Sequence, residues 1–214
     1  MIENKDLIDF PRKDEMYGEV HFLRAFFYFE LVKIYGDVPL FTNGRLTAGD
    51  SGTLTRVPKS EVYAVIESDL NSAISALPAQ KSTDGRATSF TAHALLGKVY
   101  LYQEKYAEAA NILEPLVGLY TLPSDPGSVF LVSGENGPEA VFEIQHSKES
   151  NGWNWGWMPQ STEGNFGVIH HGIRGYSGPT YSSGWSFNVP TDEFHKAFRS
   201  CLLYTSPSPR DLTT

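Results

Sequence analysis

The stretch SFTAHALLGKVYLYQEKYAEAANILEPLV, residues 89–117, decides the fold of this chain. Its apolar residues recur at helical spacing on both sides of a short polar turn, which predicts two helices over roughly residues 89–103 and 105–117. Gly97 and Ala109 are small where two such helices would cross, and Tyr100 and Tyr106 are expected to fill the groove beside the crossing. The stretch is therefore predicted to be a tight helix pair.

The pair matches the tetratricopeptide helix–turn–helix pattern. The positions that carry the match are Leu96, Gly97, Tyr100, Tyr106, Ala109 and Leu113. One such repeat cannot bury its own outer faces, so neighbouring helices must cover them. Helices predicted over residues 15–35 and 60–77 can do this as a second repeat with a long insertion.

The first of these helices, residues 15–35, is apolar around almost its whole circumference. A helix of this kind is expected to be buried between others. Arg24 lies within it and is expected to pair with a carboxylate from a neighbouring helix, because an unpaired buried charge costs several kcal/mol. The helix should end at YGDVP, where Gly36 suits the position after the last turn and Pro39 prevents continuation.

A loop over residues 40–58 separates the first helix from the second. Ser60 is the expected N-cap of the second helix, and Pro78 should close it. Asn43 and Arg45 in the loop are candidate polar contacts to a ligand, although the sequence favours solvated turn residues for both.

The character of the chain changes after residue 118. The run EAVFEIQHS, residues 139–147, alternates as a strand does. Residues 148–187 carry many Gly, Ser, Asn and aromatic residues without a helical period, as functional loop regions do. This part is predicted to be an irregular, aromatic-rich layer.

Three of the four tryptophans lie in NGWNWGWMPQ, residues 151–160. In an extended strand Trp153, Trp155 and Trp157 would share one face, where their rings could stack on sugar rings while Asn154 supplies hydrogen bonds. Burial of these side chains against the helical layer is the alternative that the aromatic residue type alone favours, since large aromatic residues are mostly buried. The flanking glycines, the lack of regular structure and the family resemblance given below bring binding level with burial.

A second aromatic set follows in GIRGYSGPTYSSGW, residues 172–185. Tyr176 and Tyr181 are candidate ligand contacts, whereas a structural role is favoured for Trp185.

Charge and motifs argue against several functions. The net charge is −8 and lysine and arginine do not cluster, so nucleic-acid binding is not expected. The pair His170–His171 lacks a carboxylate at metal-ligand spacing, and no cofactor is predicted. No catalytic motif is complete; a glycan-active enzyme using Glu139 or Glu163 is the weakest of the functional interpretations.

Four blocks together resemble the SusD/RagB family of outer-membrane nutrient-binding lipoproteins of Bacteroidota. They occur in the family's order: HFLRAFFYFELVKIYGDVPL, RATSFTAHALLGKVYLYQEKYAEAANIL, NGPEAVFEIQHS and GWSFNVPTDEFHKAF. The resemblance covers roughly residues 12–199. It implies a mostly α-helical, tetratricopeptide-like fold that carries an irregular aromatic-rich loop and short-strand region.

The resemblance also implies a function and a partner. The expected role is non-catalytic binding of an oligosaccharide at the outer-membrane surface, with delivery to a SusC-like TonB-dependent transporter. The alternative is a tetratricopeptide-type scaffold that binds a peptide or protein. The family's lipid anchor and signal peptide are not present in the sequence.

The expected organisation is one fragmentary domain. Residues 1–199 form a single SusD-like unit, with helical repeats over 12–118 and the ligand-facing part over 119–199. Residues 200–214 end in CLLYTSPSPRDLTT (201–214), which resembles a translated sequencing-adapter read-through, and they are expected to be non-native; an ordinary disordered terminus is the alternative.

Overall fold

The computed structural model describes residues 9–42, 47–52, 54–80, 83–145, 172–178 and 184–187, together with Thr191 and Glu193. The chain divides into two compact units, Met1–Ile144 and Gln145–Thr214, and each is described by itself.

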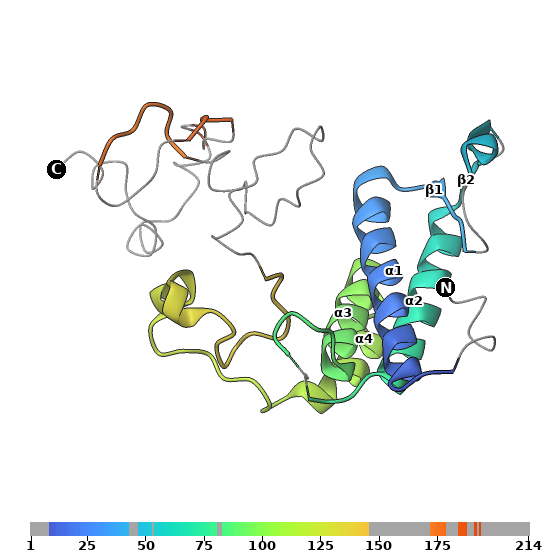
Figure 1. Ribbon diagram of the computed structural model, residues 1–214, viewed down its shortest axis with the longest axis horizontal. Helices are drawn as coiled ribbons and strands as arrows, with labels where there is room; N and C mark the ends of the chain where they lie inside the picture. Colours follow the sequence, from blue (N-terminus) through green and yellow to red (C-terminus); the bar gives the residue numbers. More distant parts are fainter. Residues whose placement is uncertain are drawn as a thin grey trace. The chain divides into compact units, whose positions relative to one another are not determined.

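The first unit is built from α-helices, as the sequence predicts (Figure 1). Its elements are α1 (Lys13–Tyr35), β1 (Val38–Pro39), η2 (Ala48–Gly52), β2 (Arg56–Val57), α2 (Lys59–Ala76), α3 (Ser89–Tyr102), α4 (Tyr106–Leu113), η3 (Glu114–Leu116), η4 (Pro126–Phe130) and η5 (Val132–Gly134). Each α-helix packs against the next one along the chain. The η elements are short 3-10 turns, and β1 and β2 form a two-stranded antiparallel ladder.

The core lies between α1, α2 and α3. Its largest fully buried side chains are Phe22, Phe29, Val62, Ile66, Leu70, Leu96 and Val99. Burial of seven such side chains stabilises the helical layer by about 1.5–3 kcal/mol each before the entropy of ordering is subtracted.

The α3–α4 pair crosses closely, as predicted. A methyl group on Gly97 would lie 2.5 Å from Leu113 Cγ, so only glycine fits there, and Ala109 is 2% exposed. The prediction for Tyr106 is wrong: it is the first residue of α4 and is exposed, while Lys105 lies over the Tyr100 ring instead. The second helix is also shorter than expected, because Pro115 lies two residues after Leu113 and the chain tightens into η3.

The predicted cap of α2 is wrong in its residue. The helix begins at Lys59, one residue earlier than expected, and Ser60 lies inside its first turn. The Lys59 amide donates to Asp37 Oδ1 at 2.8 Å, so a side chain from the preceding loop satisfies this helix end. Asp37, 22 residues before Lys59, therefore takes the place of a local N-cap residue.

The strand predicted over residues 139–147 does not form in its described part, residues 139–145. This segment docks on the helices instead: Thr91 Oγ1 donates to the Val141 carbonyl at 3.3 Å, and Phe142 packs edge-on against Phe22. A strand needs a partner strand, and contacts with α1 and α3 occupy that place here.

The expectation that α1 is buried all round is wrong for the described chain. One face packs against the core through Phe22, Ala25, Phe29 and Val32, but Leu23, Phe27, Leu31 and Ile34 are exposed. The reason is that described helices cover α1 from one side only, chiefly α2.

Candidate functional site

The base of the loop that carries Asn43 and Arg45 is fixed to α1. Tyr28 Oη donates to the Phe41 carbonyl at 3.1 Å, and the Phe41 amide donates to Tyr28 Oη at 2.8 Å. The β1–β2 ladder pairs Val38 with Val57 and closes the loop from its other end. Asn43 and Arg45 themselves lie outside the described residues, so their role remains a prediction.

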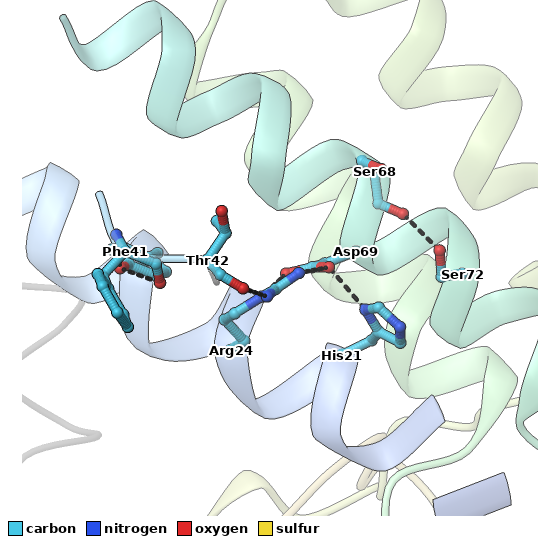
Figure 2. Close-up of polar contacts among 8 residues, drawn as sticks. His21, Arg24, Phe41, Thr42, Ser68, Asp69 and Ser72 are labelled. Carbon is cyan, nitrogen blue, oxygen red and sulfur yellow. Dashed lines mark hydrogen bonds and ion pairs between the residues drawn. The ribbon is translucent and has the colours of Figure 1, made fainter. Parts of the chain in front are cut away.

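An ionic cluster joins α1 to α2 beside this loop (Figure 2). Arg24 donates from Nε to Asp69 Oδ2 at 2.6 Å and from Nη2 to Oδ1 at 2.7 Å. His21 Nδ1 lies 2.7 Å from Asp69 Oδ1, and Arg24 Nη1 donates to the Thr42 carbonyl at 3.3 Å. The sequence-based prediction of a carboxylate partner for Arg24 is confirmed.

The chemistry of this cluster is structural. Asp69 is 2% exposed, so its charge needs partners, and Arg24 supplies a two-pronged one. The hydrogen bonds that Arg24 donates to the Asp69 carboxylate raise the pKa of Arg24 above its ordinary value, which keeps the guanidinium charged. Because Arg24 also holds the Thr42 carbonyl, the cluster orients the chain immediately before Asn43.

The second unit holds a closed loop whose ends meet at residues 172–174 and 184–186. The Gly184 amide donates to the Ile173 carbonyl at 3.0 Å, and the Ser186 amide donates to the Gly172 carbonyl at 3.0 Å. These bonds bring the two ends of the run from Gly175 to residue 183 together. Tyr176 and Tyr181 lie within that run in the sequence.

Arg174 fastens this loop, a role that no pattern of residues around it indicates. Its Nε and Nη2 both donate to the Trp185 carbonyl, at 3.2 and 2.9 Å, and its amide donates to Ser186 Oγ at 2.7 Å. A lone arginine between Ile173 and Gly175 carries no periodicity, so only the fold could reveal its partner. Trp185 is half-buried, and its ring centroid lies 5.4 Å from that of Phe187.

Of the predicted ligand contacts, the structure places only Tyr176. It is half-buried, follows Gly175 at φ 72° and donates its amide to the Ile173 carbonyl at 3.3 Å. Trp153, Asn154, Trp155, Trp157 and Tyr181 lie outside the described residues.

Glu143, in the segment predicted to be a strand, serves local structure. Glu143 Oε2 accepts from the Asn136 amide at 2.8 Å, which fixes the turn before it. Within the described ranges, no three side chains of the His, Cys, Asp or Glu types come together as metal ligands would. Glu163, His170 and His171 lie outside those ranges.

In the described part of the first unit, packed helices anchor the loop that follows α1, and polar clusters tie these elements together. This arrangement is that of a helical-repeat protein.

Comparison with known proteins identifies the family. Residues 2–101 match the SusD-like family model described as starch-binding and associating with the outer membrane. SusD-like protein P38 of Formosa agariphila is 28% identical over 198 residues, which is 86% of this chain and 38% of that protein. A SusD-like protein of Bacteroides ovatus is 37% identical over 90 residues, 42% of this chain and 16% of that protein.

Solved structures agree. A laminarin-binding SusD-like protein is 34% identical and superposes with a TM-score of 0.79, over 97% of this chain and 46% of that chain. Surface glycan-binding protein A of Bacteroides thetaiotaomicron, solved with laminarihexaose, has a TM-score of 0.74 at 23% identity, over 93% of this chain and 43% of that one. The latter likeness shows the fold alone.

The chain belongs to the SusD-like family. This is a family of binding proteins without a catalytic step, described as associating with the outer membrane. The chain spans 38% of the length of the first two curated relatives it matches. None of α1 to α4 contains an apolar stretch of membrane-spanning length, a finding that covers the described helices only.

Proposed function

We propose that this protein captures a neutral oligosaccharide at the bacterial outer-membrane surface and passes it to a transporter. The observation that carries the proposal is the likeness to a laminarin-binding SusD-like protein, which extends over 97% of this chain at 34% identity. The family description names starch, and starch and laminarin are both uncharged glucose polymers. A neutral glucan is therefore the ligand class that we propose.

The residues proposed for binding are Trp153, Asn154, Trp155, Trp157, Tyr176, Tyr181, Asn43 and Arg45. A neutral glucan offers no charge, so a binding surface must use aromatic planes for the C–H faces and amides for the hydroxyls. The tryptophan run supplies both kinds of group within five residues. The anchoring of Tyr28 to Phe41 and of Arg174 to Trp185 would hold two of the loops in place, which lowers the entropy lost on binding.

The proposed partner is a SusC-like TonB-dependent transporter in the outer membrane. Membership of the SusD-like family supports this proposal, together with the family's described association with the outer membrane. In this scheme the protein binds and releases its ligand unchanged, and the transporter moves it across the membrane.

Intrinsic tryptophan fluorescence tests the proposed function. The full-length protein is titrated with maltohexaose, laminarihexaose and a charged polyuronate oligosaccharide of similar length. We expect saturable quenching or a spectral shift with a neutral glucan and none with the polyuronate. Silence towards every glycan, combined with saturable binding of peptides, would replace the proposal with the peptide-binding scaffold; release of new reducing ends would instead indicate an enzyme.

A further inference from the structure

Ser186 has a backbone conformation that few residues other than glycine adopt. Its φ is 54°, which lies in the left-handed region. Three hydrogen bonds hold it there. The Arg174 amide donates to Ser186 Oγ at 2.7 Å, and the Gly172 carbonyl accepts from the Ser186 amide at 3.0 Å and from Ser186 Oγ at 3.4 Å. Strained residues that their surroundings hold in place cluster at ligand-binding and active sites, so the chain around Ser186 is a candidate site.

The strained residue lies between two aromatic residues, Trp185 and Phe187. Their ring centroids are 5.4 Å apart and their planes are inclined at 50°, a spacing at which aromatic rings attract each other. Arg174 holds the backbone of the first aromatic residue through two bonds to the Trp185 carbonyl. Trp185 is half-buried, whereas Phe187 is 63% exposed. The inner ring therefore supports the outer one, and the outer ring lies at the surface.

This setting distinguishes Phe187 from an exposed phenylalanine of the first unit. Phe130, at the end of η4, is 88% exposed, and no residue of η4 has a left-handed backbone. At Phe187 the three bonds of Ser186 and the ring of Trp185 give the exposed side chain a defined position. A side chain that is already ordered loses little conformational entropy when it binds a ligand, which favours binding.

The chemistry of this surface selects an uncharged ligand with an apolar face. Arg174 is the only charged residue among the described residues 172–178 and 184–187. Its guanidinium donates to the Trp185 carbonyl from two nitrogens, so the cation serves the protein backbone. What remains is the flat ring of Phe187 with N–H donors nearby. A pyranose ring matches this surface, because C–H groups form its faces and hydroxyl groups its rim.

We propose that Phe187 is a further ligand contact, on which one sugar ring of a neutral glucan stacks, with Trp185 as its support. This inference rests on the proposed function, because it assigns one more contact to the same kind of ligand. It adds a residue outside the set proposed above. Ser186 and Arg174 are positioning residues in this scheme, since they act on the ligand only through the ring that they hold.

Two substitutions at one position separate stacking from apolar packing. Phe187→Tyr keeps a flat ring, and Phe187→Leu keeps an apolar side chain without one. Phe130→Leu is the matched control at the exposed phenylalanine of η4. The affinity of each full-length variant for maltohexaose and laminarihexaose is measured by isothermal titration calorimetry, and circular dichroism confirms that each variant is folded.

We expect Phe187→Leu to bind the preferred glucan about tenfold more weakly, while Phe187→Tyr and Phe130→Leu stay within about twofold of the parent. Equal affinities of the parent and Phe187→Leu would overturn this inference and leave the proposed function intact. Equal weakening by both substitutions at position 187 would indicate packing and also overturn it. A parent that binds neither glucan would overturn the proposed function and this inference together.

A fluorine label gives a second measurement that needs no loss of the ring. The full-length protein is made with 4-fluorophenylalanine at position 187, or at position 130 as the control. We expect the fluorine resonance of residue 187 to shift on titration with the preferred glucan and that of residue 130 to stay in place. A resonance at residue 187 that ignores the glucan, or that shifts only with a proline-rich peptide, would overturn the inference.

Discussion

Asp69 of α2 and Arg24 of α1, 45 residues apart in sequence, are joined by two hydrogen bonds of 2.6 and 2.7 Å (Figure 2). This contact fixes the two helices against each other and holds the chain that leads into residues 43–46. The two hydrogen bonds compensate the Arg24 and Asp69 charges for the water contacts that both lose when the helices pack.

Removing the carboxylate should leave Arg24 without its charged partner in a half-buried place. We expect Asp69→Asn to lower the free energy of unfolding by about 3 kcal/mol, because breaking a buried pair from one side is strongly destabilising. Urea unfolding followed by circular dichroism measures it. Glu61→Gln, on the exposed side of the same helix, is the control and should change stability by less than about 0.5 kcal/mol. Equal effects of the two substitutions would contradict a structural role for the cluster.

The start of α2 offers a choice between two capping residues. Asp37→Ala should cost about 1 kcal/mol, since it removes the acceptor of the Lys59 amide. Ser60→Ala should be close to neutral, because Ser60 is inside the helix. Thermal unfolding of both variants distinguishes the two residues. A larger fall in melting temperature for Ser60→Ala than for Asp37→Ala would show that Ser60 is the cap after all.

The close crossing of α3 and α4 predicts that Leu113→Ala relieves part of the destabilisation caused by Gly97→Ala. Gly97→Ala gains helix propensity, yet its new methyl group would overlap Leu113, so we expect a net loss of about 1–3 kcal/mol. Leu113→Ala removes the atoms that the methyl group meets. The double variant should therefore lose less unfolding free energy than the sum of the two single-variant losses. A double-mutant cycle measures this coupling. If the two losses of unfolding free energy are simply additive, Gly97 and Leu113 are not in contact and the close crossing is contradicted.

Alkaline stability should depend on Tyr63. Burial raises the pKa of its phenol above the ordinary value of 10.0, so the folded protein favours the neutral form. Below pH 10 this contribution is fully present; it is lost as the pH rises through the folded pKa, because the unfolded chain ionises first. Tyr63→Phe should lose less stability than the parent as the pH rises above 10.0. Tyr106→Phe, at an exposed site, should follow the parent curve.

Glycan binding should depend on Trp155. We expect Trp155→Ala to weaken binding of the preferred neutral glucan by about 1–3 kcal/mol while the melting temperature stays within 2 °C or so. Trp185→Ala is the contrasting variant, since Trp185 is half-buried and its carbonyl accepts from Arg174. A large fall in melting temperature for Trp155→Ala would assign that ring to the protein core.

Much of the helical part could be predicted from the sequence. Periodicity placed α1 to α3 within a few residues of their observed bounds, because helix formation depends on residues three and four apart. The small residue at Gly97 and the need of Arg24 for a carboxylate also followed from residue chemistry. The candidate site could be predicted only as residue types, and Tyr176 is the one member that the structure describes.

What required the tertiary structure was the identity of each distant partner. The sequence indicates that Arg24 needs a carboxylate partner, but only the packing of the helices identifies Asp69 as that partner. The first turn of a helix likewise needs a hydrogen-bond acceptor, and only the fold brings Asp37 to the Lys59 amide. Alternation over 139–145 shows an extended preference, and the contacts of Val141 and Phe142 with the helices decide against a strand. The sequence by itself thus determined the local helices and the unmet needs of their side chains, since both depend on near neighbours. Which groups meet those needs was decided by packing between segments tens of residues apart.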